Sequence, residues 1–141
     1  MTIAEPTVGV RFLVQVDDMN LGAFDGCEGL GCEVVIEQRE EGGNNGYVWQ
    51  LPSRINYPNI TLRRPLGPDT QKVARWIASM TGAVRRRTGN ISAMAPDGTV
   101  VAKWGLLDVV PVRWQGPSLG PDDTAVMTET VEIAHHGFMD M

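Results

Sequence analysis

Apolar and polar residues alternate along several stretches of this chain, which is the pattern of a β-strand with one buried face. In residues 10–17, VRFLVQVD, every second side chain is apolar, and only Leu13 interrupts the polar set. Residues 32–40, CEVVIEQRE, repeat the alternation. Extended segments are also predicted at residues 59–66, 90–95, 99–114 and 124–136. The pattern therefore predicts a protein built mainly of strands.

One stretch has the spacing of a helix instead. Between residues 69 and 82 the apolar side chains fall at i, i+3, i+4 and i+7, at Val73, Trp76, Ile77 and Met80. Asp69 can cap the start of this helix, and Gly82 can close its end. We expect the apolar stripe of the helix to pack on the strands.

Glycine and proline mark the connections between these elements. Residues 20–31, NLGAFDGCEGLG, are dense in glycine, so the chain is expected to turn or bulge there more than once. Pro96, Asp97 and Gly98 lie between two extended segments and predict a hairpin. The predicted fold is mainly β: a closed or nearly closed β-barrel, or a sandwich, of six to eight strands with one packed α-helix.

Length and charge limit the classes of protein that fit. A chain of 141 residues is expected to form a single domain over residues 1–141. No apolar run approaches the roughly 20 residues that span a bilayer, and the first ten residues lack the basic and apolar parts of a signal peptide, which favours a cytoplasmic protein. A net charge of −5 argues against general nucleic-acid binding, which depends on Lys and Arg.

Little in the sequence indicates an enzyme. The glycines of residues 29–31 lack the spacing of a phosphate-binding loop, so no nucleotide cofactor is predicted. Cys27 and Cys32 lack the spacing of a zinc site and are expected to be reduced, mostly buried thiols, so no metal is predicted either. His135 and His136 could supply a general base, but no nucleophile motif accompanies them, which favours a surface or interface role.

Residues 39–54, REEGGNNGYVWQLPSR, join a charged, glycine-rich loop to large apolar groups. The NNG turn signal predicts a hairpin that points out of the domain. A two-stranded hairpin alone is barely stable in water, so this one would need a partner surface. Burying Tyr47, Trp49 and Leu51 against a neighbour would contribute several kcal/mol, at ~25 cal/mol per Å² of apolar area. Alternatively, the hairpin folds back onto its own barrel.

The order of these segments resembles that of a known family. RFLVQVDD, EGGNNGYVWQLPSR followed by YPNITLRRPL, the turn RWQGPSL and the closing ETVEIAHHG are similar to segments of the tail tube proteins of contractile phages and phage-like contractile injection systems. The resemblance covers about residues 10–138 and extends to the tube and tube-initiator proteins of extracellular injection particles. It implies a fold similar to the type VI secretion ring protein: a barrel with one helix, assembled as hexameric rings that stack into a hollow tube lined by strands of all six subunits.

The resemblance also implies where copies touch. In such tubes an extended loop reaches the adjacent ring or subunit, and its charged tip would register the rings while Tyr47 and Trp49 anchor in a pocket. The expected contact residues between subunits are Glu40, Glu41, Asn44, Asn45, Tyr47, Trp49 and Leu51. The implied partners are further copies of the chain, a contractile sheath, baseplate, spike and cap proteins, and cargo in the lumen. The tube would be assembled in the cytoplasm and driven through a target envelope by sheath contraction, with no membrane insertion by this chain.

Two other functions fit the same sequence. A baseplate tube initiator or adaptor would have the same fold but would stop at one or a few rings. A small β-barrel enzyme or ligand binder would be a monomer and would lose activity on His135→Ala.

Overall fold

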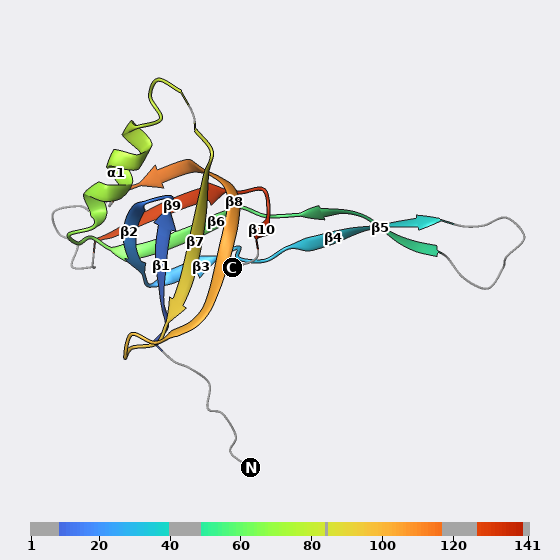
Figure 1. Ribbon diagram of the computed structural model, residues 1–141, viewed down its shortest axis with the longest axis horizontal. Helices are drawn as coiled ribbons and strands as arrows, with labels where there is room; N and C mark the ends of the chain where they lie inside the picture. The colour runs from blue at the N-terminus through green and yellow to red at the C-terminus, as the bar shows by residue number, and fades with distance from the viewer. Residues whose placement is uncertain (1–8, 40–48, 84, 117–126, 140–141) are drawn as a thin grey trace, which may run out of the picture.

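A computed structural model describes residues 9–39, 49–83, 85–116 and 127–139 of the chain. Within these ranges the elements follow in the order β1 (Arg11–Val16), β2 (Met19–Phe24), β3 (Gly26–Glu28), β4 (Glu33–Arg39), β5 (Trp49–Asn56), β6 (Ile60–Pro65), α1 (Thr70–Ala78), β7 (Arg87–Met94), β8 (Val100–Gln115), β9 (Thr128–Ala134) and β10 (Phe138–Met139). The protein is therefore mainly β with one helix, as predicted (Figure 1).

Eight strands form one antiparallel sheet in the order β2-β1-β7-β8-β9-β6-β3, with β10 also paired to β8. Strands β4 and β5 form a separate two-stranded sheet. The ladders among the described residues leave β2 and β3 at the two ends of the path. The predicted closed barrel is therefore not confirmed in the single chain.

One hydrophobic core holds this sheet to the helix. In β1 the apolar face is the buried one, as predicted, since Val14 and Val16 are both buried. On α1, Val73 and Trp76 are fully buried, and Ile77 packs partly against the core, as does Met80 just after the helix. The apolar spacing of residues 69–82 thus identified the buried face of the helix correctly.

The ends of the helix differ in detail from the prediction. Asp69 stands at the N-cap but makes no side-chain capping bond, and its carboxylate pairs with Lys72 at 2.7 Å. The helix ends at Ala78 with Ser79 as C-cap, before Gly82. The backbone N–H of Ser79 is bonded to the carbonyl of Arg75, which satisfies a terminal acceptor without glycine.

The glycine-rich residues 20–31 contain a predicted bulge, since the register between β1 and β2 shifts at Leu21, but much of the stretch is strand, which was not predicted. Gly22 in β2 has a φ of +92°, and a Cβ there would lie 2.5 Å from a carboxylate oxygen of Asp69 and 2.8 Å from the guanidinium of Arg64. The glycine therefore permits close approach of β2 to the start of α1. Leu21 and Phe24 of the same strand are buried core residues.

The predicted hairpin at Pro96, Asp97 and Gly98 is confirmed between β7 and β8. Gly98 has a φ of +90°, and the carbonyl of Ala95 accepts its backbone N–H. Asp97 accepts a bond from the backbone N–H of Thr99 at 2.9 Å, which closes the turn. In the described part of the chain, no helix is long and apolar enough to span a bilayer.

Candidate functional site

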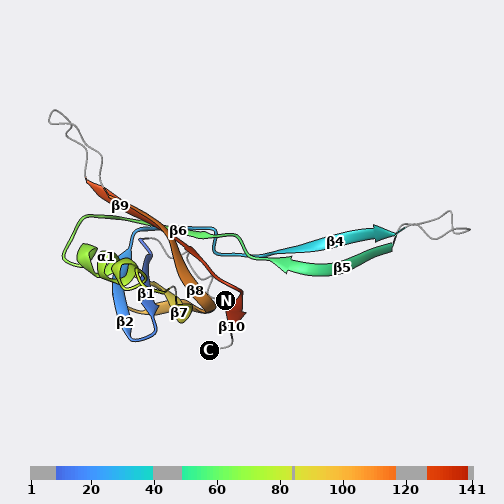
Figure 2. The same ribbon diagram turned by 90° about the horizontal axis from the view of Figure 1, so that it is seen from above.

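The hairpin of β4 and β5, called the arm below, extends away from the rest of the protein. Figures 1 and 2 both show it leaving the body on the side opposite α1. Among the described strands, β4 and β5 pair with each other and with no third strand. The alternative that the hairpin folds back onto its own barrel is therefore wrong.

The arm is amphipathic. Val34 of β4 lies directly opposite Ile55 of β5, and Ile36 lies opposite Pro52 after an irregularity in the register. Alternation puts Val34 and Ile36 on one face of β4, and Val34, Ile36 and Ile55 are 45%, 45% and 51% exposed. Three large apolar side chains therefore meet solvent on a strand pair with no core of its own.

The other face of β4 carries charged side chains. Glu33 and Glu37 alternate with the apolar residues, and both are exposed. Neither carboxylate has an ion pair among the described residues. The arm thus presents an apolar face and a charged face of mixed sign, because exposed Arg54 of β5 lies opposite Val35, between the two glutamates.

The contact residues predicted from the sequence lie at the end of this arm. Glu40, Glu41, Asn44, Asn45 and Tyr47 fall outside the described residues. The two remaining members, Trp49 and Leu51, belong to β5, and their backbones lie opposite Arg39 and Glu37.

Sequence reasoning missed the apolar face nearer the body. Its signal was present in the alternation of residues 32–40, but that pattern was interpreted as a face buried in the protein's own core. Alternation predicts that a face is covered, and it does not identify the covering surface.

At the root of the arm, where it joins the body, the segment that leads into β4 lies close to the segment that follows β5. Gly29 has a φ of +88°, and a Cβ there would collide with the carbonyl oxygen of Asn59. Just beyond this contact β3 pairs with β6, with Glu28 opposite Thr61. Cys32, expected to be mostly buried, is instead exposed beside the root, while Cys27 is half-buried in β3.

The two histidines have structural partners. His135 is buried, and its Nδ1 accepts the backbone N–H of Gly137 at 3.1 Å. Its ring lies 5.4 Å from that of Tyr57 and 5.5 Å from that of Phe138, between centroids. His136 is exposed, and its Nδ1 lies 3.1 Å from a carboxylate oxygen of Asp108. The described residues hold no cluster of three metal-binding side chains.

Burial of His135 makes stability depend on pH. Burial lowers the pKa of His135 below its ordinary 6.5, and it outweighs the opposing effect of the Gly137 carbonyl, which lies 3.4 Å from Nδ1 and would accept a hydrogen bond from the protonated ring. The unfolded chain therefore binds the proton more readily, and the free energy of unfolding should fall as pH drops below about 6.5, by up to ~1.4 kcal/mol per pH unit. We expect His135→Gln to reduce this slope in denaturant titrations between pH 7 and 5. His136→Gln should retain it, and an unchanged slope in His135→Gln would contradict the assignment.

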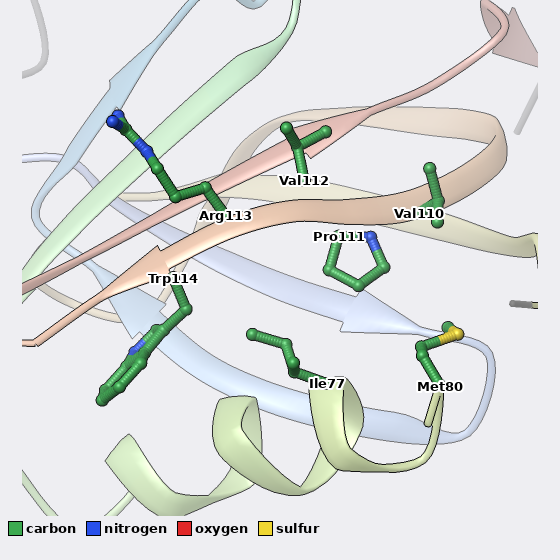
Figure 3. Close-up of a pocket in the computed structure, with 7 residues that line it drawn as sticks. All are labelled: Ile77, Met80, Val110, Pro111, Val112, Arg113 and Trp114. Carbon is green, nitrogen blue, oxygen red and sulfur yellow. The ribbon is translucent and has the colours of Figure 1, made fainter. Parts of the chain in front are cut away.

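A second apolar surface lies between the end of α1 and β8, and it is called the α1/β8 groove below. Figure 3 shows Ile77 and Met80 on the helix side facing Pro111 and Trp114 of β8. The groove has a volume of about 250 Å³. The register between β8 and β9 shifts between Pro111 and Arg113. This bulge turns Pro111 and Trp114 toward the same side, although strict alternation would separate them.

A buried charge pair contacts Trp114, one of the residues that line the groove. Arg64 and Glu129 lie opposite each other in β6 and β9, and their side chains are 5% and 0% exposed. An oxygen of Glu129 lies 3.5 Å from the guanidinium of Arg64 and accepts the indole N–H of Trp114 at 3.4 Å. The bond to Glu129 fixes the Trp114 ring that lines the groove.

Arg64 also ties two elements together. Its guanidinium donates to the carbonyl of Leu21 at 2.6 Å and to that of Asp69 at 2.9 Å, and it lies 4.0 Å above the ring of Phe24. The sequence carried a signal for this pair, because Arg64 follows Ile60 and Leu62 in the buried phase of β6.

Comparisons with known proteins agree with this architecture. The family model described as T4-like virus tail tube protein gp19 matches residues 8–139. No match was found among curated proteins.

Three solved structures illustrate the likeness of fold. A chain from the sheath-tube complex of an extracellular contractile injection system, PVC, in the extended state has a TM-score of 0.78 at 22% identity, covering 97% of this chain and 92% of that one. A chain from the PVC sheath/tube terminator in the extended state has a TM-score of 0.81 at 21% identity, covering 98% of both chains. Hcp1 from Flavobacterium johnsoniae has a TM-score of 0.52 at 14% identity, covering 93% of this chain and 99% of that one.

Proposed function

The chain belongs to the T4-like virus tail tube protein family, and from this premise we propose that its copies form hexameric rings that stack into a hollow tube. It is a structural subunit of the inner tube of a phage tail or phage tail-like contractile particle. In this proposal residues 1–141 act as one domain, and the role is mechanical rather than enzymatic.

The exposed apolar face of the arm is the observation that carries the proposal. Val34, Ile36 and Ile55 project on a hairpin that pairs with no third strand of the described chain. A two-stranded sheet of this kind needs an added surface to be stable. Another copy of the chain supplies such a surface once per subunit, so that each arm is covered when rings stack. The expected contact residues at the arm's end, Glu40 to Leu51, extend the same interface.

The free edges of the main sheet support ring closure. Strands β2 and β3 each have one edge without a ladder among the described residues. A free edge can accept a strand from another chain, and such pairing removes the edges that would otherwise promote aggregation. In the proposed ring, strands of six copies complete the barrel around the lumen that the isolated chain leaves open.

The proposed partners follow from the same likeness. A contractile sheath would surround the tube and drive it through a target envelope, as the sheath-tube complex of the PVC particle suggests. Baseplate, spike and cap proteins would bind its ends, and cargo could occupy the lumen. We propose that assembly takes place in the cytoplasm, and that this chain neither inserts into a membrane nor binds nucleic acid as its function.

Electron microscopy of the purified protein alone tests the proposal. We expect negative-stain images to show long hollow tubes of stacked six-fold rings, because arm and body are both present in each copy. Single rings would instead favour the tube initiator of the same particle. A uniform monomer at high concentration would contradict the proposed self-assembly.

A further inference from the structure

We propose that His135 is a pH-sensitive clamp on the arm: its neutral ring holds Tyr57 at the arm's root, and its protonated ring releases Tyr57. The inference concerns the direction of the arm within one copy, and it therefore goes beyond the proposed assembly. The parts of the clamp are the segment that follows β5 and the turn between β9 and β10.

The direction of the arm depends on contacts at its root. Gly29 approaches the carbonyl of Asn59, but this contact joins the two chains of the root to each other. A hairpin held only in this way can pivot on the body. Tyr57 directly follows the last residue of β5, and its ring packs against His135 and against Phe138 of β10. Figures 1 and 2 both show β10 beside the point where the arm leaves the body, so this second contact fixes the arm's direction.

The contact around Tyr57 is close. Its ring centroid lies 5.4 Å from that of His135 and 5.6 Å from that of Phe138, and those two rings are 5.5 Å apart. All three pairs are within the range of favourable aromatic contacts. Gly137 has a φ of +126°, and a Cβ there would lie 3.0 Å from the Tyr57 ring. A shift of the His135 ring or of the Gly137 backbone therefore displaces Tyr57.

The hydrogen bonds of His135 suit only its neutral form. Nδ1 accepts the backbone N–H of Gly137 at 3.1 Å, so this nitrogen carries no proton. Nε2 then carries the proton of the neutral ring, and this atom is buried without a hydrogen-bond partner among the described residues. A proton added to Nδ1 would point at the N–H of Gly137. The ring would have to turn toward the carbonyl of Gly137, 3.4 Å from the same nitrogen, or leave the cluster.

The surrounding groups favour the neutral ring at pH 7. Burial lowers the pKa of His135, and a positive charge on the adjacent His136 lowers it further. The facing groups from the arm root and from β10 are the uncharged rings of Tyr57 and Phe138. From β8, Asp108 pairs with His136. Within the described part of the chain, no carboxylate lies at ion-pair distance from His135.

Spin labels on the arm and on the body measure the release in the unassembled protein. Gln38→Cys in β4 and Val101→Cys in β8 place the labels at exposed positions, in a background that carries Cys32→Ser. Cys27 is retained, because burial raises its pKa to about 11 and keeps it a weakly reactive thiol. From pH 7.5 to pH 5 we expect the distance distribution in pulsed electron paramagnetic resonance to widen about twofold, because the arm then samples more directions.

Matched variants assign this effect to the clamp. His135→Gln keeps an acceptor for the N–H of Gly137 without a titrating group, so its distribution should stay narrow at both pH values. His136→Gln should widen like the original protein. Tyr57→Ala should be wide at both pH values, and Tyr57→Phe, which retains the ring, should widen only at pH 5.

Three results would overturn the inference. The first is an unchanged width in the original protein at pH 5. The second is equal widening in His135→Gln and in the original protein. The third is a loss of the body's circular dichroism at the same pH as the widening, because release of the arm would then be part of global unfolding.

A consequence for assembly rests on the proposed function. An arm held in one direction loses less freedom when another copy covers it, so the concentration needed for tube formation should rise about tenfold from pH 7.5 to pH 5. In His135→Gln it should rise less than about threefold. Tubes from both proteins with an equal rise would overturn the clamp and leave the proposed function intact. Absence of tubes from the original protein at pH 7.5 would contradict the proposed function, and the spin-label distances would still decide on the clamp.

Discussion

Replacing Arg64 with methionine is expected to lower the free energy of unfolding of the subunit by about 3–5 kcal/mol. The change leaves Glu129, which is 0% exposed, as a buried charge whose ion pair is lost. It also removes the two bonds from the guanidinium to the carbonyls of Leu21 and Asp69, which join β2 and the start of α1 to β6. Denaturant unfolding of the unassembled protein, followed by circular dichroism, measures the loss.

The neighbouring residue provides a matched control. Arg63 pairs with Glu28 at 2.6 Å, but their side chains are 52% and 68% exposed. Such surface pairs contribute little, so Arg63→Met should change stability by no more than about 1 kcal/mol. The double variant Arg64→Met/Glu129→Leu should recover much of the loss, because it removes the stranded charge. Equal losses for Arg63→Met and Arg64→Met would refute the role assigned to burial.

Replacing the apolar face of the arm with threonine is expected to abolish tube formation. The triple variant Val34→Thr/Ile36→Thr/Ile55→Thr keeps β-branched side chains, so the strands retain their backbone preference. It removes apolar area from three side chains that each contribute about 1.5–3 kcal/mol when fully buried. Because all three are exposed in one copy, stability of the unassembled subunit should change by less than about 1 kcal/mol. Electron microscopy and sedimentation at matched concentrations give the readout.

Two exposed valines elsewhere serve as the comparison. Val100 and Val101 are 53% and 52% exposed at the start of β8, away from the arm. Val100→Thr/Val101→Thr should assemble like the unmodified protein. If this variant and the arm variant lose assembly alike, a general decrease in surface hydrophobicity explains the result better than the arm does.

Strand β1 and helix α1 could be predicted from sequence, because the spacing of apolar residues within each element matches the side chains that are buried. The alternation of residues 10–17 identified β1, and the spacing of Val73 and Trp76 identified the buried face of α1. Strands β2 and β3 were missed because glycine signals both turns and close backbone approach, and Gly22 serves the second purpose. Only the positions of Asp69 and Arg64 in the folded protein show that Gly22 allows a close approach of the backbone and does not mark a turn.

The candidate site could be predicted in outline but not in its details. The turn signal after Arg39 predicted a hairpin that points out of the domain, and the local pattern alone could not decide between this direction and folding back onto the body. The α1/β8 groove escaped prediction because a bulge at Val112 changes which side of β8 faces the helix. Register shifts of this kind reverse the faces of a strand, so alternation beyond them misassigns side chains.

The placement of the arm at one end of the body gives any stack of these subunits a direction. One terminus of the tube would carry a ring of uncovered arms, and the other would carry a ring of empty receiving surfaces. These termini differ in shape and in charge, so a protein that seals one would not fit the other. A tube of this chain therefore requires two different terminating proteins, and growth by addition of subunits would proceed at unequal rates from its two ends.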